Sequence, residues 1–77
     1  MKALKDLKVG ENGVVSEILT NGNIRRRFID IGLIKGSLVK CVGISPFGNP
    51  KAYLIRGAVI AIRKNDCADI LVTNEVV

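Results

Sequence analysis

The chain has 77 residues, of which 48% are hydrophobic, so it is long enough for one small domain with a compact core. A domain of this size has no room for a deep catalytic cleft in addition to its scaffold. Its 12 Lys and Arg residues outnumber its 7 Asp and Glu residues, and the net charge of +5 favours acidic partners. Most of the cations are scattered along the chain, which is typical of a solvated basic surface.

The two cysteines, Cys41 and Cys67, lack the CxxC spacing, and the chain has no histidine. No stretch approaches the ~20 apolar residues of a membrane span. The N-terminal residues contain no apolar run long enough for a secretory signal. We therefore expect a cytosolic protein with reduced thiols, and we interpret both cysteines as small core residues.

Residues 1–12 place Leu4, Leu7 and Val9 among lysines, and we expect this lead-in to dock its two leucines on the rest of the domain. Residues 14–19 alternate between two faces, one of them clearly apolar, which predicts a strand. The polar triplet at 21–23 ends this strand and supplies an N-cap for the element that follows.

Residues 24–31 fit an amphipathic helix, because Ile24, Phe28 and Ile31 recur at i, i+4 and i+7 and share one face. We expect these three side chains to be buried. Gly32 suits the left-handed position that ends many helices, and Leu33 can then pack back onto the helix.

Arg25, Arg26 and Arg27 form the one run of cations in the chain. At ~100° per residue they spread over about 200° of the helix, so they cannot all contact one phosphate group. Arg26 and Asp30 lie four residues apart and can pair weakly in water. The stem of Arg27 borders the apolar face. The run is therefore either a solvated face or a contact surface for an acidic partner.

The rest of the chain predicts four more short strands, at residues 37–44, 51–56, 58–63 and 69–73. The segment 45–50 contains two prolines and a glycine and is typical of a loop. Residues 64–68 indicate one helical turn, with Asn65 as its expected N-cap. Residues 74–77 are expected to fray.

Five short strands and one short helix in 77 residues predict a mainly β fold, a small barrel, because closure removes exposed strand edges. SH3-like and OB-like barrels both have this size. The helix lies between the first and second predicted strands, and this position does not fit the usual OB arrangement.

Enzymatic chemistry has almost no support in the sequence. There is no histidine base and no GxxxxGK[ST] or GxGxxG phosphate loop, and the acids show no paired spacing. A metal site built on Cys41 and Cys67 needs two further ligands of a suitable type, and the sequence offers none. An oxygen-ligand site at Asp66 or Asp69 is a weak alternative. We predict a protein without catalytic residues, cofactor or tightly bound metal.

Nucleic-acid binding has the required charge but lacks a stacking platform. The aromatic residues are Phe28, Phe47 and Tyr53, and Phe28 lies on the core face of the predicted helix. Phe47 lies in the predicted loop and is the aromatic side chain that we expect to be exposed. An exposed loop phenylalanine is a modest sign of an apolar contact with a partner.

Three sequence blocks, in this order, resemble the FeoA family. They are RRR-x-x-x-x-GL-x-x-G from Arg25 to Gly36, P-x-G-x-P at residues 46–50, and G-x-x-x-x-[LI]-R from Gly57 to Arg63. The resemblance extends from about Leu4 to Val72. It departs from the family's usual pattern at Phe28, Lys35 and Asn49, where Leu, Pro and Asp are frequent.

The resemblance implies a single SH3-like domain over residues 1–77, like those at the C-terminus of iron- and manganese-dependent repressors. It implies a non-enzymatic, cytoplasmic accessory protein of bacterial ferrous-iron uptake. The partner it implies is FeoB, a membrane transporter with a cytosolic GTPase domain, through which the protein would reach the inner membrane. The partner-binding residues that we predict are Arg25, Arg26, Arg27, Lys35 and Phe47. Two alternatives stay open: a small basic nucleic-acid-binding barrel and a stand-alone metal-sensing domain.

Overall fold

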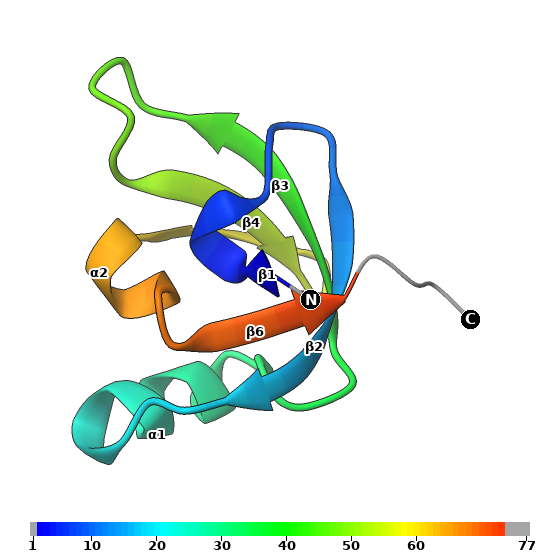
Figure 1. Ribbon diagram of the computed structural model, residues 1–77, viewed down its shortest axis with the longest axis vertical. Helices are drawn as coiled ribbons and strands as arrows, with labels where there is room; N and C mark the ends of the chain where they lie inside the picture. The colour runs from blue at the N-terminus through cyan, green and yellow to red at the C-terminus, as the bar shows by residue number, and fades with distance from the viewer. Residues whose placement is uncertain (1, 74–77) are drawn as a thin grey trace.

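The computed structural model describes residues 2–73, which form a strongly curved antiparallel sheet with α1 along one side and two shorter turns at one end (Figure 1). The elements in chain order are β1 (Lys2–Ala3), the 3-10 turn η1 (Leu4–Asp6), β2 (Asn12–Ile18), α1 (Gly22–Asp30), β3 (Leu38–Ile44), β4 (Lys51–Ile55), β5 (Ala58–Ile62), α2 (Lys64–Cys67) and β6 (Ile70–Thr73). The predicted tail at residues 74–77 lies outside the described residues.

The six strands pair in the order β1-β6-β2-β3-β4-β5. The mainly β class is confirmed, as is the position of α1 between the first two long strands, β2 and β3. The additional strand relative to the prediction is the two-residue β1, which pairs with β6. The hydrogen-bonded sheet does not close, so β1 and β5 remain as its two edges.

Two β-bulges bend the sheet around its core. One lies in β2 between Val15 and Glu17, and the other lies in β3 between Cys41 and Gly43. A bulge adds a residue to one strand and increases the local twist. The bulge in β2 also disturbs the alternation that the sequence predicts there: Val15 is fully buried, whereas Val14 and Ile18 are only half-buried.

The core lies on the concave side of the sheet. Its buried side chains are Leu4, Leu7, Val15, Phe28, Leu33, Val39, Cys41, Tyr53, Ile55, Ile62, Cys67, Ile70 and Val72. Cys41 and Cys67 are both buried and unpaired, which confirms their interpretation as small core residues. The docking of Leu4 and Leu7 is confirmed as well. Val9 lies in the turn before β2 and is 56% exposed.

The N-terminal segment is fastened by side chains from β4. The Tyr53 hydroxyl donates to the Leu4 carbonyl at 3.1 Å. The Lys51 ammonium donates to the Lys5 carbonyl at 2.7 Å and to the Leu7 carbonyl at 2.9 Å. The Leu4 carbonyl also accepts the Leu7 N–H at 3.1 Å, so the Tyr53 hydroxyl is its second donor. Helix α2 packs against the same turn.

Helix α1 ends as its sequence predicts. Gly32 has φ +86°, its N–H donates to the Ile29 carbonyl at 3.0 Å, and the Leu33 N–H donates to the Phe28 carbonyl at 2.8 Å. This pair of bonds is a Schellman motif, and Leu33 is fully buried behind it. Phe28 is buried as expected, but Ile24 and Ile31 are only partly buried because they face an open groove.

The short helix α2 is capped from a distant loop. Its N-cap residue is Arg63, so the prediction of Asn65 was wrong, and Asn65 lies inside the first turn. The Asn49 side-chain oxygen accepts the Lys64 N–H at 2.9 Å and supplies the cap instead. Phe47 lies in the same β3–β4 loop and is 95% exposed, as the sequence predicts.

Candidate functional site

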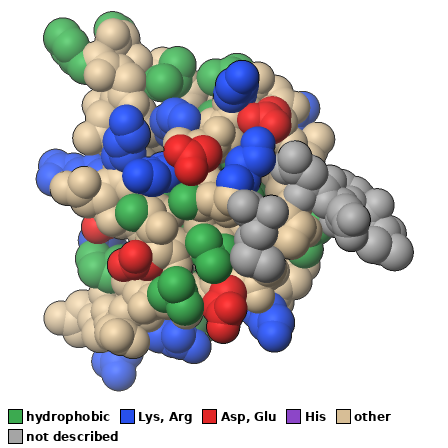
Figure 2. Space-filling model, viewed as in Figure 1, with side chains coloured by type: hydrophobic (Ala, Val, Ile, Leu, Met, Phe, Trp, Pro, Cys, Tyr) green, Lys and Arg blue, Asp and Glu red, His purple; other side chains and the backbone are tan. Residues whose placement is uncertain are grey.

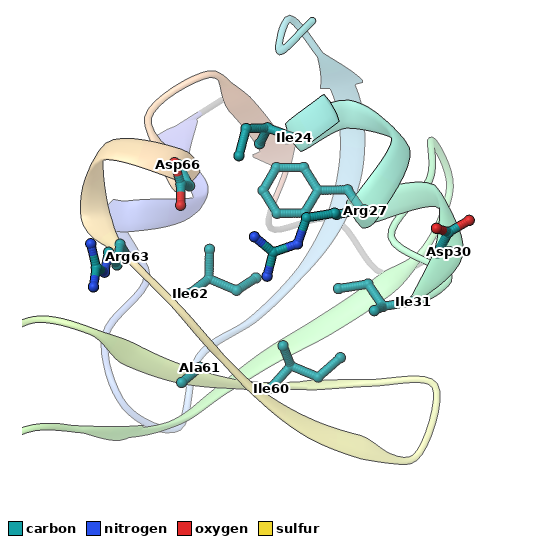
Figure 3. A pocket seen from close by; sticks show the side chains of 10 residues that line it. Ile24, Arg27, Asp30, Ile31, Ile60, Ala61, Ile62, Arg63 and Asp66 are labelled. Carbon is teal, nitrogen blue, oxygen red and sulfur yellow. The ribbon is translucent and has the colours of Figure 1, made fainter. Parts of the chain in front are cut away.

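A groove of about 560 Å³ runs between α1 and the edge strand β5 (Figure 3). It is lined by Ile24, Arg27, Phe28, Asp30, Ile31, Ile60, Ala61, Ile62, Arg63 and Asp66. Its walls are apolar side chains from the helix on one side and from the strand on the other. Such a concave apolar surface with a few charged groups is the usual form of a binding site.

The groove exists because apolar side chains on both of its walls, α1 and β5, are only partly covered by the rest of the protein. Ile24 and Ile31 lie on the apolar face of α1, at either end of the buried Phe28, and remain partly exposed. Ile60 is likewise only partly buried. Figure 3 shows the Arg27 side chain reaching into the space between helix and strand, whereas Asp30 points away from it. The groove therefore combines apolar side chains with the guanidinium group of Arg27, which reaches into it.

Strand β5 has an unpaired outer edge along this groove. The turn at Arg56 and Gly57 has φ values of +50° and +83°, which identify a two-residue hairpin loop of the I′ type. In such a hairpin the flanking pair, Ile55 and Ala58, is hydrogen-bonded, and bonded and non-bonded pairs then alternate. The backbone groups of Val59 and Ala61 consequently point outward. Within residues 2–73, neither residue has a backbone partner beyond the β4–β5 pairing.

An edge strand beside an apolar groove can accept an extended segment as an added strand. Main-chain hydrogen bonds to Val59 and Ala61 would hold such a segment, and alternate side chains of the segment would enter the groove between α1 and β5. Two cations, Arg27 and Arg63, and two carboxylates, Asp30 and Asp66, line this groove, so the charges along it balance. The arrangement is suited to binding rather than to bond-breaking chemistry.

The three consecutive arginines differ in their surroundings. The Arg25 Nη1 atom donates to the Ile18 carbonyl at 3.3 Å, next to the start of α1. Arg26 is exposed, whereas Arg27 lines the groove. The expected pair between Arg26 and Asp30 does not form: over residues 2–73 the one ion pair joins Lys2 to Glu11 at 3.1 Å.

The other two predicted site residues lie apart from these arginines. Lys35 follows α1 and lines a second hollow together with Lys40 and Arg56. Phe47 lies in the β3–β4 loop, at the far end of the molecule from α1 (Figure 1). The structure therefore does not bring the five predicted residues together. The groove contains two further residues, Ile31 and Ile60, that the sequence analysis did not select. Their partial exposure could not be predicted from the apolar residues of their own segments.

The charged side chains are distributed over the surface and do not form one basic patch. Figure 2 shows basic side chains across the visible face with acidic side chains between them. Glu11 accepts the Lys8 backbone N–H and pairs with Lys2, and these contacts, in that order, lower the pKa of its carboxyl group. This carboxyl group lies outside the groove and stabilises the turn before β2.

The buried titratable groups belong to the core. Burial raises the pKa of the Cys67 thiol to about 11. Burial also raises the pKa of the Tyr53 hydroxyl above its usual range. Both groups are therefore neutral near pH 7, and a thiol that holds its proton is a poor nucleophile and a poor metal ligand. Among residues 2–73, no three His, Cys, Asp or Glu side chains are grouped so that they could hold a metal ion.

The FeoA domain model matches residues 2–74, and the chain belongs to this family. A curated relative, the Fe(2+) transport protein A/Fe(2+) transporter FeoB fusion protein of Porphyromonas gingivalis, is 28% identical over 67 residues. That match covers 87% of this chain but only 8% of the length of the relative. None of the helices in residues 2–73 has the length and apolar character needed to cross a membrane.

Two solved structures confirm the fold that the resemblance implies. The FeoA protein of Chlorobium tepidum is 28% identical and superposes with a TM-score of 0.89, covering 96% of this chain and 70% of that one. The FeoA protein of Stenotrophomonas maltophilia, solved with zinc and described as an SH3 domain protein, is 26% identical with a TM-score of 0.80. That match covers 95% of this chain and 91% of the Stenotrophomonas chain. The predicted SH3-like class and the predicted family are therefore both confirmed.

Proposed function

We propose that this protein is a non-enzymatic accessory module of bacterial ferrous-iron uptake that binds the cytosolic, GTPase-bearing part of a FeoB-like transporter. The observation that carries the proposal is the fusion relative, in which a segment similar to this chain belongs to the same polypeptide as a FeoB transporter. A covalent link holds two domains at a high effective concentration. A separate chain needs a binding surface to reach the same proximity.

The surface that we assign to this contact is the groove between α1 and β5, extended by the arginines of α1. An extended segment of the transporter would pair with the free edge of β5 at Val59 and Ala61. Its apolar side chains would contact Ile31 and Ile60 in the groove. Acidic residues beside the segment would face Arg26 and Arg27, and their main effect would be on the rate of association.

We propose no enzymatic role, because the side chains of the groove do not suit catalysis. Its charged groups are Arg27, Arg63, Asp30 and Asp66, and the chain contains no histidine that could act as a base near neutral pH. The protein would work in the cytoplasm and reach the inner membrane through the transporter. Nucleic acid is not the expected partner, because the groove exposes no aromatic platform for stacking bases.

The test is calorimetric titration of the chain with the cytosolic domain of the FeoB-like transporter from the same organism. Ala61→Pro removes an outward N–H that an added strand would use, and a proline is tolerated on an edge strand. Ala61→Ser is the matched control because it keeps this N–H. We expect the proline variant to bind at least about tenfold more weakly, by the loss of a hydrogen bond in a desolvated interface.

Two results would contradict different parts of the proposal. Absence of binding by the unmodified chain would contradict the partnership itself. Equal affinity of the proline variant, the serine variant and the unmodified chain would show that the transporter binds elsewhere, while the partnership would stand.

A further inference from the structure

A second hollow, of about 570 Å³, lies on the outer face of the sheet beside the β4–β5 turn. We call it the cationic hollow. Its apolar surface comes from Ile34, Leu38 and Leu54, which are 42%, 54% and 36% exposed. Its charged residues are Lys35, Lys40 and Arg56, and no carboxylate lines it. It shares no lining residue with the groove between α1 and β5.

The cations of this hollow stand directly beside its apolar side chains. Lys40 of β3 is the register partner of Leu54 of β4, and Leu54 is in turn the partner of Val59 of β5. Val59 is 65% exposed, so the apolar surface continues past the hollow onto the edge strand. Within residues 2–73, none of the three cations of the hollow takes part in an ion pair. Exposed apolar area of this kind marks interaction sites.

Hydrogen bonds and side-chain packing order the walls of the hollow in the unbound protein. The Ser37 hydroxyl donates to the Gly32 carbonyl at 2.8 Å and accepts the Ile34 N–H at 3.0 Å. On the opposite wall, the aliphatic stem of Arg56 lies against Gly32, so closely that a β-carbon there would collide with it. A surface that is ordered in advance loses less entropy on binding.

We propose that the cationic hollow binds an acidic peptide segment that carries an apolar side chain between carboxylates. The apolar side chain would contact Leu38 and Leu54, and the carboxylates would face Lys35, Lys40 and Arg56. This inference goes beyond the proposed function, because it concerns a separate surface and does not require the transporter. A protein with both surfaces would bind two segments at the same time.

Charge complementarity favours this occupant over the others. Two copies of the chain meeting symmetrically at this face would bring the same three cations together, which costs free energy. A nucleic acid would meet apolar side chains without an aromatic ring on which to stack, since the exposed Phe47 lies in the β3–β4 loop and does not line the hollow. A bilayer is too flat to fill a hollow.

The test uses a synthetic peptide with two leucines flanked on each side by glutamates, titrated into isotopically labelled protein and followed by NMR. Control peptides replace the glutamates with glutamines or the leucines with serines. The test variant is Lys35→Glu with Lys40→Glu. The matched control is Lys8→Glu with Lys64→Glu, which changes the net charge equally at two exposed residues outside the hollow.

We expect saturable shifts at residues 34–38, Lys40, Leu54 and Arg56, and at least about tenfold weaker binding for the test variant than for the control variant. Both control peptides should bind more weakly than the acidic peptide, and added salt should weaken binding. Shifts confined to α1, or equal binding of the glutamine peptide, would overturn the proposal. Binding of the acidic peptide that does not saturate would also overturn the proposal. So would vesicles of phosphatidylglycerol that bind more strongly than the peptide and lose this binding in the test variant.

Discussion

Two regions of the molecule differ in how completely their side chains are covered. We call the region formed by η1 and α2 the sealed end, because its apolar side chains are buried. We call the region formed by α1 and β5 the open side, because its apolar side chains are partly exposed. At the sealed end, Leu4 and Cys67 are completely buried, and Tyr53 and Lys51 bond to the backbone of the N-terminal segment. Along the open side, no hydrogen bond within residues 2–73 joins α1 to β5. The two regions separate two tasks: one supplies stability, and the other leaves apolar surface and a strand edge available for a partner.

The largest expected effect compares one leucine of the sealed end with one isoleucine of the open side. Leu4→Ala should lower the free energy of unfolding by about 2–5 kcal/mol, because Leu4 is fully buried. Ile60→Ala, in the wall of the groove, should cost only about 1 kcal/mol, because its side chain is already partly exposed. Urea unfolding of both variants measures the difference. Equal losses would mean that the groove belongs to the core.

Alkaline pH should weaken the sealed end selectively. The folded pKa of Cys67 is about 11, above the ~8.5 of an unfolded cysteine, so the unfolded chain loses this proton first. The contribution is fully present below pH ~8.5 and is lost as the pH rises toward 11, with a fall in stability on the order of 3 kcal/mol.

The measurement is the urea midpoint as a function of pH, for the unmodified chain and for Cys67→Ala. The variant should show a flatter dependence between pH ~8.5 and ~10, before the tyrosine titrates. Parallel curves for the two proteins would assign the alkaline loss to another group.

Gly32→Ala tests the packing of Arg56 against Gly32, at the C-terminal end of α1. Gly32 has φ +86°, and a β-carbon there would also collide with the stem of Arg56. We expect a loss of about 1–2 kcal/mol from the backbone conformation, plus a further loss from displacing Arg56. Gly48→Ala is the matched control, since Gly48 has φ +80° with open space around it. Thermal unfolding of both variants isolates the cost of displacing Arg56, and equal losses would show that this side chain moves aside without cost.

The smallest effect on stability is expected from Arg25→Glu combined with Arg26→Glu. These exposed charges should change the free energy of unfolding by less than about 0.5 kcal/mol. If α1 is part of the transporter contact, the variant should associate with the FeoB-like cytosolic domain more slowly and with a weaker salt dependence. Stopped-flow or surface-binding kinetics would show this, with Lys8→Glu and Lys64→Glu as the charge-matched control. Unchanged kinetics would identify the arginine run as a solvated face.

Local features of this protein could be predicted from the sequence alone. The end of α1 at Gly32 and the burial of Phe28 follow from residue type and spacing within one element. The burial of Leu4 and Leu7 follows from their apolar character in a short chain. The exposure of Phe47 follows from its loop of prolines and glycine. Each of these depends on neighbours within a few positions.

The remaining features depend on contacts between distant parts of the chain. Asn49 caps α2 fifteen residues away, so the helix start could not be located from its own sequence. The bulge in β2 is a property of its pairing with β6 rather than of its residue pattern. Lys35, Lys40 and Arg56 come together only because the Ile34–Ser37 turn, β3 and the β4–β5 hairpin meet at one surface. The sequence analysis therefore selected Lys35 but could not group it with Lys40 and Arg56.

The unpaired edge of β5 has a consequence for solubility. Residues Ala58–Ile62 read AVIAI, five β-forming or small residues without a charge, and such a segment on an open edge can pair with copies of itself. Arg56 and Arg63 lie close to its two ends, and charges in these positions oppose aggregation. Their repulsion between copies is screened within about 8 Å at physiological ionic strength. Light scattering of concentrated protein should therefore increase with added salt, and Ala61→Lys should suppress that increase.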